Sequence, residues 1–329
     1  MRQVQFDRFG GPEVLDIVEK PTPIPGSDQI LVRVQAIGVN FAETLMRENR
    51  YAVTPHLPAV PGTEVAGVVE RLGDKVAGLT VGTRVAVPLF ATGAVTGGYS
   101  DHVVVNAALA VPLPEGISFE TATALMIQGL TALYLVRQVP PKDKVVLVSA
   151  AAGGVGSLLI QLAKRAGARA VIAAASSKAK LDLARTLGAD HGVDYSKPGW
   201  DEAVRAVSGG SGPDIIYESV GGDVTKTCLS MLAAGGEIVI YGALNIQSFN
   251  LGIPELVSLI FKNQSLTGFA LPTLLTSDGL TSGLSNLFDL AASGLLKVQI
   301  GNTFALKDAS LAHQAMEARA TTGKVVLIP

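Results

Sequence analysis

The chain has 329 residues, and at about 150 residues per domain this length predicts two domains with a sizeable core. Its 26 basic and 28 acidic side chains leave a formal charge of -2, so no basic surplus is present and nucleic acid is not an expected partner. A single cysteine, Cys228, excludes a disulfide framework and a multi-cysteine metal site.

The N-terminal sequence MRQVQFDRFGG mixes charged, polar and apolar residues, which is not typical of a signal peptide, so we expect a cytoplasmic protein. Residues 145–163 carry no charge and are long enough to cross a membrane. However, Gly153, Gly154 and Gly156 interrupt this stretch, and its first part, VVLVSA, is typical of a buried strand. We therefore expect no membrane span.

The first part of the chain predicts short strands separated by Gly and Pro. In chain order these strands are expected within residues 29–38, 62–73, 83–87 and 97–105. After VPLPEG, Ser118 is a capping residue type that predicts the start of a helix. This mostly-β region is the predicted first part of a catalytic domain, residues 1–121.

Residues 122–265 form the predicted second domain, in which strands alternate with helices. Strands are expected within 144–150, 168–176, 191–195, 213–221 and 236–242, and helices within 154–167, 178–188, 200–209 and 224–232. Such alternation is typical of an α/β domain with a doubly wound parallel sheet.

The C-terminal part, residues 266–329, is expected to return to the first domain, so that the second domain is an insertion. After a strand-like run at 265–271, the sequence predicts helices at 280–294 and 308–319 and strands within 297–306 and 324–329.

A dinucleotide-binding turn is predicted between the first strand and the first helix of the second domain. In VVLVSAAAGGVGSLLIQLAK, Ala151, Gly153 and Gly156 occupy the three small-residue positions of the fingerprint. Small residues let the backbone approach a pyrophosphate, whose charge is stabilised by the N-terminus of the helix.

The end of the next strand predicts NADPH rather than NADH. An NAD site usually has an acidic side chain there, whereas this chain has Ser176, Ser177, Lys178 and Lys180. Hydroxyl and ammonium groups suit a 2′-phosphate. The alternative is that the two lysines belong to the exposed face of the following helix.

Several motifs together resemble a known family. They are GVNFAETLMRENRY, LPAVPGTEVAGVV, QGLTALYL, AAAGGVGSLLIQLAK, SSKAKLDLARTLGAD, VDY, YESVGG and ARATTGKVVLIP. In this order, over essentially the whole chain, they resemble the zinc-independent quinone oxidoreductases of the medium-chain dehydrogenase/reductase superfamily. The resemblance implies a GroES-like β domain, a Rossmann domain, NADPH as cofactor and a homodimer.

The resemblance also implies site residues. Those expected to contact the cofactor are Asn40, Thr131, Tyr134, Gly153, Gly154, Val155, Gly156, Ser176, Ser177, Lys180, Tyr195, Ser219, Tyr241, Gly242, Phe269, Leu271 and Arg319. Asn40 is expected to orient the nicotinamide or the acceptor oxygen, and Tyr51 to cap the acceptor. Two residues depart from the family: Glu43 where aspartate is more usual, and Leu45 where some relatives have tyrosine, so the polarity of the substrate pocket is open.

No metal is expected. Related alcohol dehydrogenases bind zinc near Ile37, Thr63 and Ile127, and none of these three side chains is a good zinc ligand. A lone histidine is more often a surface or core residue than a catalyst. We expect no catalytic role for the four histidines, His56, His102, His191 and His313.

The favoured function is reduction of a quinone, or another conjugated carbonyl compound, by NADPH. Without a metal to polarise it, the acceptor must already be activated, and the protein's task is to position it and exclude water. Two alternatives stay open: a 2-enal or enoyl-thioester reductase, with Arg47, Arg50 and Lys262 as basic groups for its substrate, and a redox-inert NADPH-binding structural protein.

Overall fold

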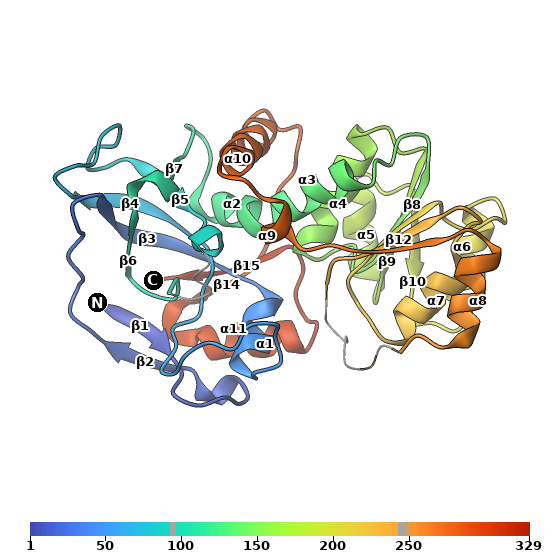
Figure 1. Ribbon diagram of the computed structural model, residues 1–329, viewed down its shortest axis with the longest axis horizontal. Helices are drawn as coiled ribbons and strands as arrows, with labels where there is room; N and C mark the ends of the chain where they lie inside the picture. The colour runs from blue at the N-terminus through green and yellow to red at the C-terminus, as the bar shows by residue number, and fades with distance from the viewer. Residues whose placement is uncertain (93–96, 243–247, 249) are drawn as a thin grey trace. The chain divides into compact units, whose positions relative to one another are not determined.

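The structure is a computed structural model that describes residues 1–92, 97–242, 248 and 250–329. The chain divides into two compact units, labelled by their elements in Figure 1. Unit 1 contains residues 1–127 and 276–329, and unit 2 contains residues 128–275. Unit 2 therefore extends beyond residue 265, the predicted end of the second domain. It includes the strand at 265–268, because this strand pairs within the sheet of unit 2.

Unit 1 is built on a mostly antiparallel sheet with the order β14-β15-β3-β4-β5-β7, and β6 also pairs with β3. The strands of unit 1 are β1 (Arg2–Gln5), β2 (Asp16–Glu19), β3 (Gln29–Val39), β4 (Val65–Leu72), β5 (Arg84–Val87), β6 (His102–Asn106), β7 (Val111–Pro112), β14 (Ile300–Ala305) and β15 (Lys324–Ile328). Its helices are α1 (Phe41–Arg47), α2 (Phe119–Ala124), α10 (Ser277–Ala292) and α11 (Ala309–Glu317). The C-terminal strand β15 lies directly beside β3.

The core of unit 1 follows from alternation along β3. Ile30, Val32 and Val34 are almost fully buried at every second position, and they pack in one cluster with valines of β4, β5 and β6. Because side chains of a strand alternate between its two faces, these residues cover one face of the sheet.

Unit 2 confirms the predicted doubly wound sheet. Its strand order is β10-β9-β8-β11-β12-β13, and every pair is parallel. The strands are β8 (Val145–Val148), β9 (Ala170–Ala175), β10 (His191–Asp194), β11 (Ile215–Glu218), β12 (Glu237–Ile240) and β13 (Ser265–Gly268). The helices are α3 (Leu130–Gln138), α4 (Gly154–Arg165), α5 (Lys178–Thr186), α6 (Trp200–Val207), α7 (Asp223–Met231), α8 (Ile253–Phe261) and α9 (Leu271–Leu274).

A π-helical turn, Leu125–Gly129, joins α2 to α3. Among the described residues, Phe119–Gln138 is the helical stretch long and apolar enough to cross a membrane, and 67% of the window tested is buried within the structure. The uncharged run at 145–163 is not one helix, because it divides into β8, a glycine turn and α4.

Candidate functional site

The carboxyl ends of the parallel strands in unit 2 bring most of the predicted cofactor residues to one edge of the sheet (Figure 1). Gly153 to Gly156 follow β8, Ser176 and Ser177 follow β9, Tyr195 follows β10, Ser219 follows β11, Tyr241 and Gly242 follow β12, and Phe269 follows β13. The strand order reverses between β8 and β11, and ligands of such sheets bind at the carboxyl edge near this reversal.

The turn after β8 has the backbone geometry that an anion site requires. Gly153 is the N-cap residue of α4, and no described side chain caps this end of the helix. A Cβ at Gly156 would run into the backbone of Ala150 and Ala151, and one at Gly154 would overlap the Gln128 side chain. The glycines therefore allow close packing and leave the first N–H groups of α4 to a ligand.

The ends of β9 and β10 adjoin, because Asp194 pairs with Ala175 and the Tyr195 N–H donates to the Ala175 carbonyl at 3.1 Å. Ser177 caps α5, and its Oγ accepts from the backbone N–H of Lys180 at 3.4 Å. Ser176, Lys180 and Tyr195 thus come from neighbouring positions at this corner of the sheet.

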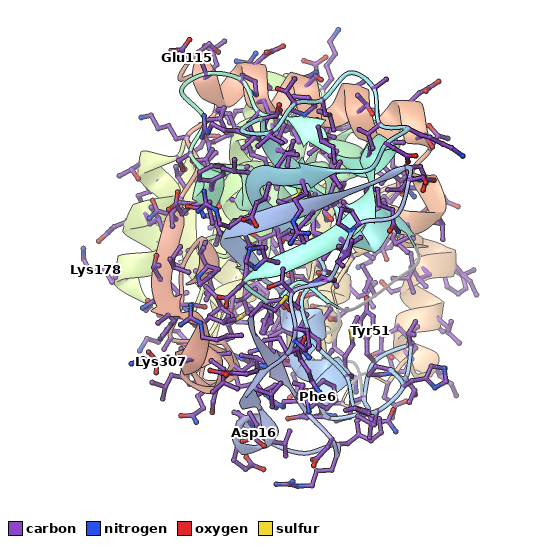
Figure 2. The ribbon with its side chains drawn as sticks, turned by 90° about the vertical axis from the view of Figure 1, so that its left-hand side faces the viewer. Phe6, Asp16, Tyr51, Glu115, Lys178 and Lys307 are labelled. Atoms are coloured by element: carbon purple, nitrogen blue, oxygen red, sulfur yellow. The ribbon has the colours of Figure 1, made fainter. Side chains whose placement is uncertain are left out.

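The two lysines of α5 differ in their surroundings. The Lys178 side chain is 88% exposed, pairs with Asp182 at 2.5 Å, and projects outward in Figure 2. Lys180 is half-buried in the first turn of the same helix. Lys178 therefore belongs to the exposed face of the helix, which was the alternative for both lysines. Lys180 remains the lysine predicted to bind the 2′-phosphate.

Glu218, at the end of β11, is a buried carboxylate that the sequence interpretation missed. It is fully buried and accepts hydrogen bonds from the Thr225 hydroxyl at 2.7 Å and from the Val220 N–H at 2.7 Å. The N–H of Ser219, the residue that follows Glu218, donates to the Ser149 hydroxyl at 2.9 Å. These bonds fix the loop beside the β8 turn. The only sequence signal was an acidic residue closing an apolar strand before two glycines.

Tyr241 lies beside this loop. Burial raises the pKa of its hydroxyl, which hydrogen-bonds with Ser219. A Cβ at Gly242 would also contact Ser219, so the ends of β11 and β12 pack closely. Of the other predicted residues of unit 2, Thr131 and Tyr134 lie on α3, which packs against α4, and Leu271 is buried in α9.

In unit 1 the predicted residue Asn40 is the N-cap residue of α1 and is only 6% exposed. Its Oδ1 accepts from the Lys324 ammonium at 2.9 Å. Its Nδ2 donates to Glu64 at 2.8 Å and to the Thr63 hydroxyl at 3.3 Å. Three partners thus fix the orientation of this amide. Its Oδ1 has a second lone pair, which can accept a hydrogen bond from a ligand.

Lys324 and Glu64 form a completely buried ion pair, with 2.5 Å between Nζ and Oε1. The other oxygen of Glu64 accepts from the backbone N–H of Ile127, in the π-helical turn, at 2.8 Å. Sequence analysis did not find this pair, because Glu64 and Lys324 are separated by most of the chain.

Glu43 is buried and joins the same network through Asn40 and Thr63. Its carboxylate accepts from the Tyr99 hydroxyl at 2.8 Å, the Thr63 hydroxyl at 2.8 Å, the Thr63 N–H at 3.0 Å and the Asn40 N–H at 3.1 Å. Burial raises the pKa of Glu43, and these hydrogen bonds act in the opposite direction. Leu45, the other departure from the family, is also buried, at 6% exposed.

The network continues through His313 to Arg47. Arg47 Nη1 lies 3.0 Å from Nδ1 of His313, whose Nε2 lies 3.0 Å from the Tyr99 hydroxyl. Since arginine only donates, Nδ1 accepts and Nε2 carries the proton, which it donates to Tyr99. Burial, with the Arg47 charge, lowers the pKa of His313 to about 3, so this histidine is neutral.

Arg47 is not available to bind a substrate, which corrects its predicted use as a basic group. Its side chain is 0% exposed, bonds to the Gly10 carbonyl at 2.9 Å and pairs with Glu317 at 2.6 Å. Arg50 pairs with Glu48 at 2.7 Å. The sequence around Arg47 gave no signal that this side chain is buried, because its partners Gly10, His313 and Glu317 lie far from it in the chain.

Two other predicted residues of unit 1 are Tyr51 and Arg319. Tyr51 is 38% exposed in the loop after α1, where Figure 2 labels it, and desolvation raises the pKa of its hydroxyl. Arg319 follows α11 with a positive φ of 54°.

The residues at the expected zinc positions do not fit a zinc ion. Ile37 and Ile127 have no ligand atom, and the Thr63 hydroxyl is bonded to Glu43. The nearby carboxylate of Glu64 is already neutralised by Lys324. Within the described residues no group of three His, Cys, Asp or Glu side chains is placed to hold a metal.

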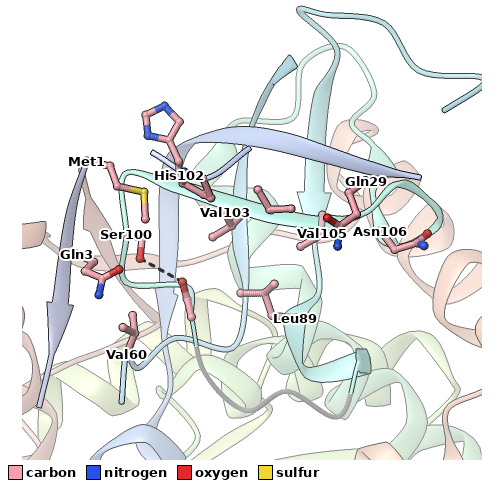
Figure 3. Close-up of a pocket in the computed structure, with 13 residues that line it drawn as sticks. Met1, Gln3, Gln29, Val60, Leu89, Ser100, His102, Val103, Val105 and Asn106 are labelled. Carbon is pink, nitrogen blue, oxygen red and sulfur yellow. Dashed lines mark hydrogen bonds between the residues drawn. The ribbon is translucent and has the colours of Figure 1, made fainter. Parts of the chain in front are cut away.

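A hollow of about 420 Å³ in unit 1 lies among residues of β3, β6 and the N-terminal strand (Figure 3). It is lined in part by Gln29, Leu89, Ser100 and Val103. None of its lining residues is a predicted site residue, so it is separate from the candidate site.

A parallel sheet with a glycine turn at its carboxyl edge, in a chain that also contains a mostly-β unit, is typical of two-domain nucleotide-dependent oxidoreductases. Residues 26–115 match the family described as alcohol dehydrogenase GroES-like domain, and residues 154–288 match the one described as zinc-binding dehydrogenase.

Full-length relatives specify the family further. A quinone oxidoreductase of Salmonella typhimurium is 39% identical, with 99% of each chain covered. A 2-haloacrylate reductase of a Burkholderia species is 34% identical over 97% of this chain and 96% of the relative. The crystal structure of Escherichia coli quinone oxidoreductase complexed with NADPH superposes with a TM-score of 0.90, at 35% identity over 100% of both chains.

The chain belongs to the quinone oxidoreductases of the medium-chain dehydrogenase/reductase superfamily. The resemblance predicted from the sequence motifs is confirmed, as is the fold class of a GroES-like domain with a Rossmann domain.

Proposed function

We propose that this protein is an NADPH-dependent quinone reductase that works without a metal. The observation that carries the proposal is the glycine turn after β8, with the uncapped N-terminus of α4, in a chain related over its full length to quinone oxidoreductases. NADPH is the cofactor of the Escherichia coli structure that this chain resembles.

The residues present fit NADPH. No side chain caps the N-terminus of α4, so its first N–H groups are available to a phosphate group. The buried Oε1 of Gln128, next to Gly154, lacks a hydrogen-bond partner in the described structure. Ser176, Lys180 and Tyr195 would hold the 2′-phosphate, where no acidic side chain follows β9 to repel it.

When bound, NADPH supplies the hydride that reduces the acceptor. The protein positions the cofactor. The loop after β11, held by Glu218, and the residues Tyr241 and Gly242 directly after β12 would support its nicotinamide half. In unit 1, Asn40 would orient a ligand oxygen or amide through an amide held rigid by Lys324 and Glu64, and the half-exposed Tyr51 would cap the acceptor.

A second candidate function is reduction of an activated carbon–carbon double bond. It is favoured by the relative described as a 2-haloacrylate reductase. An enoyl-thioester substrate is less well supported, because Arg47 is enclosed in the interior of unit 1 and Arg50 pairs with Glu48.

The test is NADPH oxidation by the purified protein with phenanthrenequinone, benzoquinone, an enone, 2-chloroacrylate and crotonyl-CoA in parallel. A quinone reductase should give its highest kcat/KM with a quinone. Faster turnover of chloroacrylate or the enone would favour the second candidate. NADPH binding without turnover of any acceptor would support a structural protein.

We also propose that the protein is a cytoplasmic homodimer formed through unit 2. β13 is the last strand in its sheet, so its outer side has no partner strand among the described residues. The neighbouring helix α8 exposes Ile253, Ile260 and Phe261 at 78%, 69% and 81%. A two-fold axis beside β13 would pair this edge with its own copy and cover apolar surface.

A further inference from the structure

Gln128 is a buried amide that the fold leaves incompletely bonded. It is 9% exposed, and its Oε1 has no hydrogen-bond partner within the described structure. Burying an unpartnered carbonyl oxygen is unfavourable, so such atoms often mark a ligand position. Neither the sequence motifs nor the resemblance gave Gln128 a role.

The amide of Gln128 lies against the start of α4. Apart from Gly154, its chain neighbours and the backbone of α4, the atom nearest to the position of a Cβ on Gly154 is Oε1 of Gln128, followed by its Cδ and Nε2. Gly154 is the first residue of α4, which has 12 residues and no side-chain cap. The missing Cβ therefore admits the Gln128 amide to the edge of the predicted pyrophosphate site.

The backbone around Gln128 supports the same position. Gln128 is part of the π-helical turn, Leu125–Gly129, and such turns inside helices frequently occur at functional sites. The preceding residue is anchored, since the Ile127 N–H donates to the buried Glu64 carboxylate at 2.8 Å.

We infer that Gln128 is a cofactor-binding residue whose Oε1 accepts a hydrogen bond from a ribose hydroxyl in the nicotinamide half of NADPH. This inference rests on the proposed function and deepens it. The pyrophosphate offers only acceptors, so a carbonyl oxygen at its edge needs a different partner, and the ribose hydroxyls flanking it are donors. The adenosine ribose is expected at the ends of β9 and β10, with Ser176 and Lys180, which leaves the ribose of the other half.

The test compares wild type with Gln128→Met, which keeps the length of the side chain and removes its polar atoms. Two ligands are titrated by calorimetry: NADPH, and the adenosine bisphosphate that represents its adenosine half with the 2′-phosphate. We expect Gln128→Met to weaken NADPH binding about tenfold, the effect of one hydrogen bond, and to leave the fragment unchanged.

The melting temperature of the ligand-free protein separates binding from structure. Because Oε1 has no partner in the protein, Gln128→Met should keep or raise Tm. The matched control is Gln264→Met, in the same unit and also 9% exposed, whose amide donates to the Leu232 carbonyl at 2.6 Å and accepts from Ser258 at 3.0 Å. This control should lower Tm and leave NADPH affinity unchanged.

Unchanged NADPH affinity in Gln128→Met, or an equal loss for NADPH and the fragment, would overturn the assignment. A lower Tm with unchanged affinity would show that Gln128 is structural and would overturn it too. Failure of the wild type to bind NADPH would instead contradict the proposed function, so the two failures are distinguishable.

Discussion

At the scale of single residues, the structure separates side chains that look alike in the sequence. Lys178 and Lys180 are two residues apart, yet Lys178 is an exposed partner of Asp182 whereas Lys180 is half-buried at the corner formed by β9 and β10. Lys324, to which the sequence analysis gave no role, is completely buried against Glu64.

Lys180→Ala should weaken NADPH binding by roughly 1–3 kcal/mol and leave NADH binding almost unchanged, because only NADPH has the 2′-phosphate. Binding of both cofactors is measured by fluorescence titration. The matched control is Lys178→Ala, which should change neither affinity, since that side chain is 88% exposed and pairs with Asp182. Equal losses for the two cofactors would contradict the role of Lys180.

Lys324→Met should lower the free energy of unfolding by about 3–5 kcal/mol, because it leaves the buried Glu64 carboxylate without its cation. Denaturant titration measures the change. Lys178→Met, which breaks an exposed pair, should change the free energy of unfolding far less than Lys324→Met does. Adding Glu64→Gln to Lys324→Met should restore part of the stability, and a double variant less stable than the single one would refute the explanation.

At the scale of elements, the edge of the sheet in unit 2 is the surface most suited to association. β13 has no fully buried residue: Ser265 and Gly268 are exposed, and Leu266 and Thr267 are half-buried. α8 also has no fully buried residue, although it is mostly apolar. An apolar helix beside an open strand is unfavourable in a monomer.

Light scattering should give about twice the chain mass of 33.9 kDa. Thr267→Pro, in the middle of β13, and Phe261→Asp, on the 81% exposed end of α8, should both shift the protein toward monomer. Val81→Asp is the control, since Val81 is an exposed apolar residue of unit 1, at 63%. A monomeric wild type at micromolar concentration would refute the proposed dimer.

At the scale of the whole molecule, the buried network of unit 1 makes stability depend on pH. His313 has a pKa of about 3 in the folded protein, whereas an unfolded histidine titrates at about 6.5. As pH falls below about 6.5 the unfolded state binds a proton that the folded state does not, so this residue destabilises the fold progressively down to pH 3. The raised pKa of Glu43 acts in the opposite sense at pH values above the ordinary pKa of a glutamate, because the folded state there retains a proton that the unfolded state has lost.

Between pH 7 and pH 5, wild type should therefore lose stability relative to His313→Gln, with a slope approaching 1.4 kcal/mol per pH unit below about pH 6. The difference between the two proteins isolates His313 from other titrating groups. Chemical denaturation at a series of pH values measures it, and parallel curves would show that His313 is not the cause.

Activity of the whole enzyme should survive prolonged chelation, because Ile37, Thr63 and Ile127 supply no zinc site. Elemental analysis of the purified protein should find no stoichiometric zinc. One zinc ion per chain would contradict this prediction.

The sequence by itself determined the alternating strands and helices of unit 2 and the glycine turn, because periodicity and small residues act over a few positions of the chain. The family resemblance supplied the candidate cofactor residues that follow each parallel strand, and the carboxyl ends of such strands meet at one edge of the sheet. Their roles in binding remain predictions.

Only the tertiary structure decided the surroundings of the polar residues that lie inside. Glu64 meets Lys324, Arg47 meets His313, and Gln128 meets Gly154 across long separations in the chain. Local pattern carries no signal for such pairs, because burial of a charge or an amide depends on partners that distant strands and helices bring to it. For this reason the sequence analysis offered Arg47 as a basic group for a substrate and gave Gln128 no role.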